Sequence, residues 1–368
     1  MIDRRKFGLS AMGLAASVAL PSIRARSQQP TVFRVANAAG INDPQQIFST
    51  AGRYPKLGFY QAEGVDFEFV NVANPSQGMQ SVATGETAMA SLTPQLFIPI
   101  IAKDPSFPVI ATYNWLPRNA SAVAVKPEAP LQTIAALRGK RIGIRNQGDI
   151  GRVVVKTMLR ELGLDDAGTE YIAVGDGGGA GSALYHDQVD ALASFDTACA
   201  RVELAGFKLR YLPLTPKFAA TPSGYFGFSK KMVSEKRREI IGFTRALAKS
   251  TIFARTNPEQ CIQMHWEMYP ESKPKSKSLD EAKAEMMFLL SKRMDHWMPP
   301  AENPDQRMGA TTVDDWNALI AITSETAGDP QLAAKIGDPK KLFTSDMIDE
   351  INAFDREAII RQAQAFKA

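Results

Sequence analysis

A glycine-rich loop at Gly175–Gly179 (GDGGG) is the stretch of this chain whose residues most directly suggest chemistry. Glycines allow a backbone to approach a ligand closely and to turn its N–H groups toward it. Gly175, Gly177 and Ala180 satisfy the pattern G-x-G-x-x-A after a predicted strand, and Asp196 follows about twenty residues later, as in dinucleotide-binding units. The loop therefore predicts backbone contacts to a ligand, and a dinucleotide is one candidate.

Nucleophilic and metal chemistry find little support in the rest of the chain. The three histidines are His186, His265 and His296, and none lies at a metal-ligand spacing from another. No G-x-S-x-G motif occurs, and these histidines have no evident Ser or Cys partner. The two cysteines, Cys199 and Cys261, form no disulfide framework, so we expect two unpaired, buried thiols.

The loop lies inside a predicted strand–helix–strand–helix–strand unit. The predicted strands are Arg141–Arg145, Glu170–Val174 and Ala191–Phe195. Apolar residues repeat at helical spacing over Ile150–Leu162, and Asp149 is predicted to cap this helix at its N-terminus. Parallel strands joined by helices gather their loops at the carboxyl edge of the sheet, where ligands bind.

A similar unit lies about one hundred residues earlier in the chain. A predicted strand at Phe67–Val72 precedes a polar loop, a short helix, a turn and a second strand at Thr87–Ser91, in the order that follows Glu170. Such an internal echo predicts two similar α/β lobes. After about Tyr225 the pattern is almost wholly helical.

The first 27 residues predict a signal peptide of the twin-arginine type. Arg4, Arg5 and Lys6 precede an uncharged, apolar run over Phe7–Leu20, which is too short to span a bilayer. Adjacent arginines followed by Phe7 resemble a twin-arginine signal. We therefore expect an exported, periplasmic protein whose signal peptide is removed.

The predicted signal also carries the net charge of the chain. The formal charge of the whole chain is +4, and the first 27 residues hold five basic residues against one acidic residue. A mature chain near neutrality has no electrostatic preference for nucleic acid or a membrane surface. We expect no nucleic-acid partner, no metal, no cofactor and no transmembrane segment in the mature chain.

Several stretches together resemble one known family. They are KLGFYQAEGVDFEFV (Lys56–Val70), LRGKRIGIRNQGD (Leu137–Asp149), LRELGLD (Leu159–Asp165) and VGDGGGAGSALYHDQVDAL (Val174–Leu192). In order and spacing they resemble periplasmic solute-binding proteins of ABC importers, in the group that takes taurine, alkanesulfonates, nitrate and thiamine-pyrimidine precursors. Relatives often carry a Glu-Pro pair after the last lobe strand, where this chain has Asp196-Thr197.

The resemblance implies a two-lobe periplasmic-binding-protein fold (type II). Each lobe would be a mainly parallel sheet flanked by helices, with a helical C-terminal extension. Residues 32–113 plus 225–368 would form lobe 1, residues 119–214 would form lobe 2, and hinge segments would lie near 114–118 and 213–224. The lobes would close on a small molecule without transforming it and would dock on an ABC transporter permease in the inner membrane.

The ligand is then expected at the loops that leave the strands of both lobes. The candidates are Asn37, Gly40, Asn42, Asn74, Ser76, Gln77, Thr93, Gln95, Asn114, Trp115, Asn146, Gln147, Gly175, Asp176, Gly177, Asp196 and Tyr225. This set is rich in amides and acids and has almost no cation, although Arg118 and Arg145 are near. It favours a pyrimidine-like heterocycle over a sulfonate or related small acid, for which helix N-termini could still serve.

Two enzymatic alternatives remain open at this stage. A periplasmic NAD(P)-dependent oxidoreductase would use the Gly175–Gly177–Ala180 loop, but only about seven residues separate that loop from the turn at Asp187, which is short for a dinucleotide-binding crossover helix. A pyrimidine-synthesising enzyme on the same fold would need reactive histidines and a cysteine cluster, which the sequence lacks.

Overall fold

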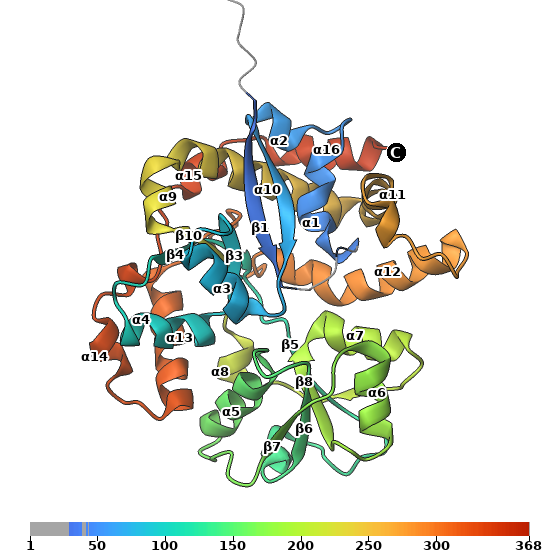
Figure 1. Cartoon of the computed structure of the whole chain (residues 1–368), viewed down its shortest axis with the longest axis vertical. Coiled ribbons are helices and arrows are strands. Elements are labelled where there is room, and N and C mark those ends of the chain that lie inside the picture. The colour runs from blue at the N-terminus through green and yellow to red at the C-terminus, as the bar shows by residue number, and fades with distance from the viewer. Residues whose placement is uncertain (1–28, 39–41, 43, 368) are drawn as a thin grey trace, which may run out of the picture.

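Two five-stranded sheets organise the chain, each in its own lobe, as Figure 1 shows. The structure is a computed structural model that describes residues 29–38, 42 and 44–367. The predicted signal peptide, 1–27, and the predicted site residue Gly40 lie outside these residues. No helix in the described part of the chain is both long and apolar enough to cross a bilayer.

The first sheet has the strand order β2-β1-β3-β10-β4 and defines lobe 1. β1 pairs in parallel with β2 and β3, whereas β10 runs antiparallel to β3 and β4, so the sheet is mixed. Its strands are β1 (Thr31–Asn37), β2 (Val65–Asn71), β3 (Met89–Leu92), β4 (Val109–Leu116) and β10 (Gly224–Ser229).

The second sheet has the order β7-β6-β8-β5-β9 and defines lobe 2. β6 lies parallel to β7 and β8, and β5 runs antiparallel to β8 and β9, so this sheet repeats the mixed pattern of the first. Its strands are β5 (Ser121–Val125), β6 (Arg141–Ile144), β7 (Glu170–Ala173), β8 (Ala191–Phe195) and β9 (Arg210–Tyr211). The predicted α/β class with two lobes is confirmed, although each sheet is mixed.

Helices cover both sheets, and the α-helices after β10 belong to lobe 1 (Figure 1). Those of lobe 1 are α1 (Ile47–Thr50), α2 (Phe59–Ala62), α3 (Pro75–Ala83), α4 (Pro94–Lys103), α9 (Lys230–Glu235), α10 (Arg237–Thr256), α11 (Pro258–Met268), α12 (Leu279–Arg293), α13 (Val313–Ala327), α14 (Leu332–Ile336), α15 (Ile348–Ile351) and α16 (Arg356–Ala365). Those of lobe 2 are α5 (Gly151–Glu161), α6 (Gly177–Tyr185), α7 (Asp196–Leu204) and α8 (Pro216–Ala219).

Two helices of the C-terminal segment reach across to lobe 2. α12 packs against α7, and α13 packs against α5 as well as α4 (Figure 1). The C-terminal helices therefore complete lobe 1 and also set its contact with lobe 2.

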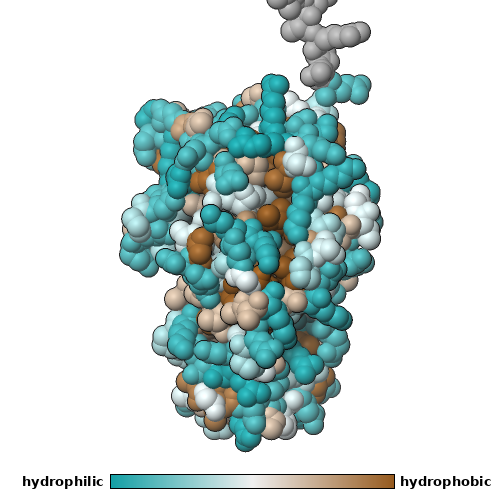
Figure 2. All heavy atoms as spheres, turned by 90° about the vertical axis from the view of Figure 1, so that its left-hand side faces the viewer, coloured by the Kyte–Doolittle hydropathy of each residue, from teal (hydrophilic) through white to brown (hydrophobic). Residues whose placement is uncertain are grey.

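On the face that Figure 2 shows, hydrophilic side chains dominate and hydrophobic ones gather in the middle of the molecule.

The chain passes between the lobes twice. It leaves β4 at Leu116 and enters β5 at Ser121, and it returns between β9 and β10. The first crossing covers residues 117–120, because β10 pairs with β4 as far as Leu116. The crossings are joined to each other, since the Asn119 side-chain amide donates to the Phe218 carbonyl (2.7 Å) and the Ala120 N–H donates to Ser223 Oγ (2.6 Å).

Candidate ligand-binding site

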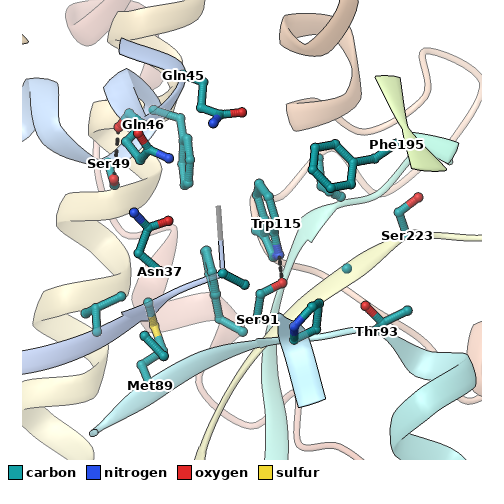
Figure 3. A pocket seen from close by; sticks show the side chains of 18 of the residues that line it. Asn37, Gln45, Gln46, Ser49, Met89, Ser91, Thr93, Trp115, Phe195 and Ser223 are labelled. Atoms are coloured by element: carbon teal, nitrogen blue, oxygen red, sulfur yellow. Dashed lines mark hydrogen bonds between the residues drawn. The ribbon is translucent and has the colours of Figure 1, made fainter. Parts of the chain in front are cut away.

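A cavity of about 160 Å³ lies where the lobes meet, at the carboxyl ends of β1 and β3 (Figure 3). One buried water needs roughly 10–15 Å³, so this space suits a small organic molecule. Residues of both lobes line it. They are Val35, Ala36, Asn37, Ala38, Gln45, Gln46, Phe48, Ser49, Phe67, Phe69, Pro75, Met89, Ser91, Thr93, Trp115, Leu116, Ala120, Arg145, Asp149, Ile150, Phe195, Ser223, Gly224, Phe226, Phe243, Leu247 and Arg293.

An aromatic stack forms one wall of the cavity. The Trp115 ring stacks with both Phe48 and Phe226, with centroid distances of 5.1 and 5.0 Å and interplanar angles of 18° and 12°, and the two phenylalanine rings lie 6.3 Å from each other. Trp115 Nε1 donates to Ser91 Oγ (3.1 Å), which fixes the plane of the indole (Figure 3). A rigid aromatic wall of this kind suits a flat or apolar ligand group.

Two arginines face the cavity from opposite lobes, and each is held by an aspartate. Arg145, which follows β6, donates from Nε to Asp149 Oδ2 (3.0 Å). Arg293, at the end of α12, donates from Nε to both carboxylate oxygens of Asp196 (2.8 and 2.9 Å). Both guanidiniums lie over the Phe195 ring, with its centroid 4.9 Å from Cζ of Arg145 and 5.7 Å from Cζ of Arg293.

These pairings leave donors for a ligand. Nη1 of Arg145 and Nη1 of Arg293 have no hydrogen-bond partner among the residues that the structure describes. Each guanidinium is matched by one carboxylate, so the site offers hydrogen-bond donors with little net positive charge. Such a site accepts an oxygen-bearing ligand group without requiring a full negative charge.

Asp196 is the most heavily engaged acid at this interface. Besides Arg293, it interacts with His296 Nδ1 through Oδ2 (2.9 Å) and accepts from the Thr197 N–H through Oδ1 (2.6 Å). Burial alone would raise the pKa of this carboxyl, but the charge of Arg293 and the hydrogen bonds of His296 and Arg293 outweigh burial and lower the pKa. Asp196 is therefore a carboxylate of lobe 2 that binds side chains of lobe 1.

Other hydrogen bonds join the lobes around the cavity. Arg145 Nη2 donates to the Ala38 carbonyl (3.3 Å), Thr197 Oγ1 donates to Gln45 Oε1 (3.1 Å), and Asn146 Nδ2 contacts the Ala73 carbonyl (3.5 Å). The lobes therefore touch around the site in this conformation.

Three of the predicted site residues line the cavity, namely Asn37, Thr93 and Trp115. Asn37 Nδ2 donates to Asn71 Oδ1 (3.0 Å), while Thr93 precedes α4. Gln95 lines a smaller space beside Thr93. The sequence located Asn37 and Thr93 because each lies at the carboxyl end of a strand of the first sheet, and Trp115 because it lies near the predicted hinge.

Several other predicted residues lie at the rim, where the lobes approach each other. Asn74 caps α3 by accepting from the Gln77 N–H (3.0 Å). Its side chain lies close to Gly148 of lobe 2, where an added Cβ would be only 2.4 Å from Asn74 Nδ2. Ser76 and Gln77 are exposed beside it. Residues of lobe 2 line a separate open groove against α12; they are Asn146, Gly175, Asp176 and Gly177.

The remaining predicted residues lie away from the cavity lining. Asn114 is buried within β4, and Tyr225 is buried in β10, where its hydroxyl contacts Thr311 Oγ1 (3.0 Å). Asn42 is partly buried, and Gln147 contacts the Tyr171 carbonyl (3.4 Å). Asp196 reaches the cavity only through Arg293, which lines it.

The cap predicted at Asp149 is wrong, and the difference matters for the site. α5 begins at Gly151 with Ile150 before it, and Asp149 instead turns inward, where it binds Arg145 and accepts from Ser194 Oγ (3.2 Å). A lone Asp before a helical pattern favours a cap. The signal that was missed is Arg145, four residues earlier, which offers Asp149 an ion-pair partner.

Sequence reasoning also missed most of the apolar lining and one of the two arginines. Arg293 lies 97 positions after Asp196, in a helix without any site signature, and Phe195 reads as an ordinary strand residue. Ser223 ends the return crossing and Phe226 follows it in β10, so both could have been found only by placing that crossing at the site.

No histidine and no cysteine is among the described residues that line the cavity. His265 is buried in α11, where burial lowers its pKa to about 3, and Nδ1 contacts Thr50 Oγ1 (3.0 Å). His186 contacts Ser182 in α6. Cys199 and Cys261 are both buried and unbonded, as predicted. In the described part of the chain, no three His, Cys, Asp or Glu side chains form a metal-binding cluster.

Several solved structures share this fold. One is from Bordetella bronchiseptica RB50 (19% identity, 89% of this chain and 98% of that chain covered, TM-score 0.66). Another is the periplasmic aliphatic sulphonate binding protein of Escherichia coli (15%, 86% and 92%, 0.61). A third is the alkanesulfonate-binding protein of Xanthomonas axonopodis pv. citri bound to MOPS (16%, 88% and 98%, 0.58).

Sequence comparison gives the family directly. No sequence among the curated proteins matches the chain. Residues 54–261 match the model of the family described as NMT1/THI5 like, and the match covers more than half of the chain. The dinucleotide alternative finds no support in these comparisons, and Asp196, which it would place on a ribose, is buried against Arg293. The chain therefore belongs to the NMT1/THI5-like family and has the two-lobe fold of the periplasmic binding proteins.

Proposed function

We propose that this protein is the extracytoplasmic solute-binding component of an ABC importer, and that it binds its solute in the cavity between the lobes without transforming it. The observation that carries the proposal is the cavity itself, because its lining comes from both lobes. A solute that contacts both lobes binds the closed conformation better than the open one, and it shifts the population toward closure.

Export and docking follow from the same proposal. The signal peptide at 1–27 delivers the chain to the periplasm, and the closed form presents its solute to a permease in the inner membrane. Support comes from the sequence pattern and from structural neighbours, one of which is the ligand-binding component of an ABC-type import system from Staphylococcus aureus. The crossings at residues 117–120 and 212–223 serve as the hinge.

The polar end of the solute carries oxygen acceptors. Arg145 and Arg293 supply Nη1 donors from the two lobes, and each charge is balanced by an aspartate. A sulfonate or carboxylate fits these donors, as does a carbonyl of a pyrimidine-like heterocycle. Two of the neighbours are sulfonate-binding proteins, which supports the first of these.

Calorimetry on the mature chain tests the proposal. The panel comprises sulfonates, nitrate, pyrimidines and aromatic acids, and we expect at least one micromolar ligand, a binding free energy of roughly −8 kcal/mol. Arg293→Gln should weaken that ligand at least tenfold, because the loss of a charge-assisted bond costs about 1.5–3 kcal/mol. Arg255→Gln is the control, since Arg255 pairs with the exposed Asp295 away from the cavity lining. Equal affinity in both variants would place the ligand elsewhere.

Small-angle scattering tests closure on the same samples. Saturation with the ligand found by calorimetry should reduce the radius of gyration. Superimposable profiles with and without a saturating ligand would contradict ligand-driven closure while leaving binding itself intact.

A further inference from the structure

We infer that the inner half of the cavity, inside lobe 1, is a subsite for an apolar chain or ring, so that the solute is amphipathic. This inference rests on the proposed function and names the class of solute that the site takes. The polar end of the solute lies between the lobes, and its apolar end lies between the first sheet and α10.

The sheet provides one wall of this subsite. Val35 of β1 is in register with Phe69 of β2 and with Met89 of β3, so the three side chains form a row across neighbouring strands. All three line the cavity, as does Phe67, two residues before Phe69 on the same face of β2.

Helix α10 provides the opposite wall. Phe243 and Leu247 both line the cavity, and their spacing of four residues places them on one face of the helix. Both are almost fully buried, and Phe243 packs on Phe67 with a centroid distance of 5.8 Å. The sheet and the helix therefore present apolar side chains to the subsite from two sides.

Polarity changes along the strands toward the cleft. Asn37 lies two residues after Val35, and Ser91 lies two residues after Met89, so each is one step further along the same face. In Figure 3 Met89 lies toward one end of the cavity and Phe195 toward the other, with Asn37, Ser91 and Trp115 between them. The charged residues of the lining, all beyond this polar step, come from lobe 2 and from the end of α12.

This gradient identifies the solute by its chemistry. Protein interiors are close-packed and contain few voids larger than a water molecule, so an apolar cavity of this size is a feature that suits a solute group. A charged group there would lose its hydration without a partner, whereas a hydrocarbon gains from leaving water. An amphipathic solute satisfies both ends of the cavity.

Two series of probes test the inference by calorimetry on the mature chain. They are the n-alkanesulfonates and the n-alkanamides from two to eight carbons, which share tails and differ in the polar end. Affinity should rise by about fourfold per methylene in both series until the subsite is full, as expected for burial of one methylene. The difference in affinity between the two series at equal chain length measures the contribution of the polar group. The change in affinity per methylene within each series measures the contribution of the apolar tail.

Variants of Leu247 separate specific binding from nonspecific adsorption of longer chains. Leu247→Phe should weaken the affinity for the longest probes at least tenfold and leave the affinity for the two-carbon probes unchanged. Leu247→Ala should move the plateau toward longer chains. Ile252→Phe is the matched control, because Ile252 is equally buried on α10 but does not line the cavity.

The outcomes distinguish this inference from the proposed function. A flat dependence on chain length, or equal losses in Leu247→Phe and Ile252→Phe, would overturn the apolar subsite while the solute still bound between the lobes. If no probe and no compound of the wider panel bound, the proposed function itself would fail. Thermal unfolding of each variant confirms that the comparison uses folded protein.

Discussion

The carboxylate of Asp196 in lobe 2 binds the guanidinium of Arg293 in lobe 1. Asp196 and Arg293 are both buried, and their contact has several hydrogen bonds with His296 alongside. Buried ion pairs add little net stability compared with apolar residues, but removal of one partner is costly because the other charge stays buried. The pair thus acts mainly to fix where the Arg293 donors point.

Substitution Asp196→Asn tests this view of the pair. We expect a loss of roughly 3–5 kcal/mol in the free energy of unfolding, since Arg293 would keep its charge without a balancing carboxylate. Asp187→Asn is the control, because Asp187 is an exposed partner of Lys126 and its backbone has a φ of 56°, which Asn tolerates. Urea denaturation of both variants measures the difference, and equal stabilities would show that the pair is relaxed or hydrated.

The lowered pKa of Asp196 gives the same pair a pH signature. The unfolded chain takes up a proton at the ordinary Asp value of about 4, and the folded chain takes it up only at lower pH. Stability from this group is therefore present above about pH 4 and is lost as pH falls further. The stability gap between the native chain and Asp196→Asn should shrink as pH falls below about 4. A gap that vanished above pH 5 would contradict the lowered pKa.

The start of helix α5 positions one side of the site. Its first residue, Gly151, lies against β8, and a Cβ there would come within 2.2 Å of the Ala193 carbonyl oxygen and 2.7 Å of Ile144 Cγ2. Asp149 and Ile150, which line the cavity, immediately precede it. Only glycine permits this approach, so the start of α5 and the Arg145–Asp149 pair are placed together.

Substitution Gly151→Ala should therefore push α5 away from β8. We expect a loss of at least about 1–3 kcal/mol in the free energy of unfolding from overpacking, with weaker ligand binding. Gly178→Ala in α6 is the matched control, since its Cβ would have its nearest neighbour at 3.8 Å, and alanine there should be neutral or stabilising. Thermal denaturation of the two variants measures the contrast, and similar melting temperatures would contradict the close packing at Gly151.

The two-lobe architecture of the whole molecule was predictable from the sequence, because the pattern of strand, loop and helix occurs twice in tandem. Asn37 and Thr93 were found because ends of strands can be recognised locally, and Trp115 was found because it lies near the predicted hinge. Arg293 could not be found this way. Its contact with Asp196 depends on where α12 packs against α7, and that packing has no local signature.

A crystal structure of the mature chain with its tightest ligand tests the central claim most directly. We expect ligand density in the cavity beside Trp115, with an oxygen of the ligand within hydrogen-bond distance of Nη1 of Arg145 or Arg293 and contacts to both lobes. Density bound on one lobe alone, or outside this cavity, would contradict the account.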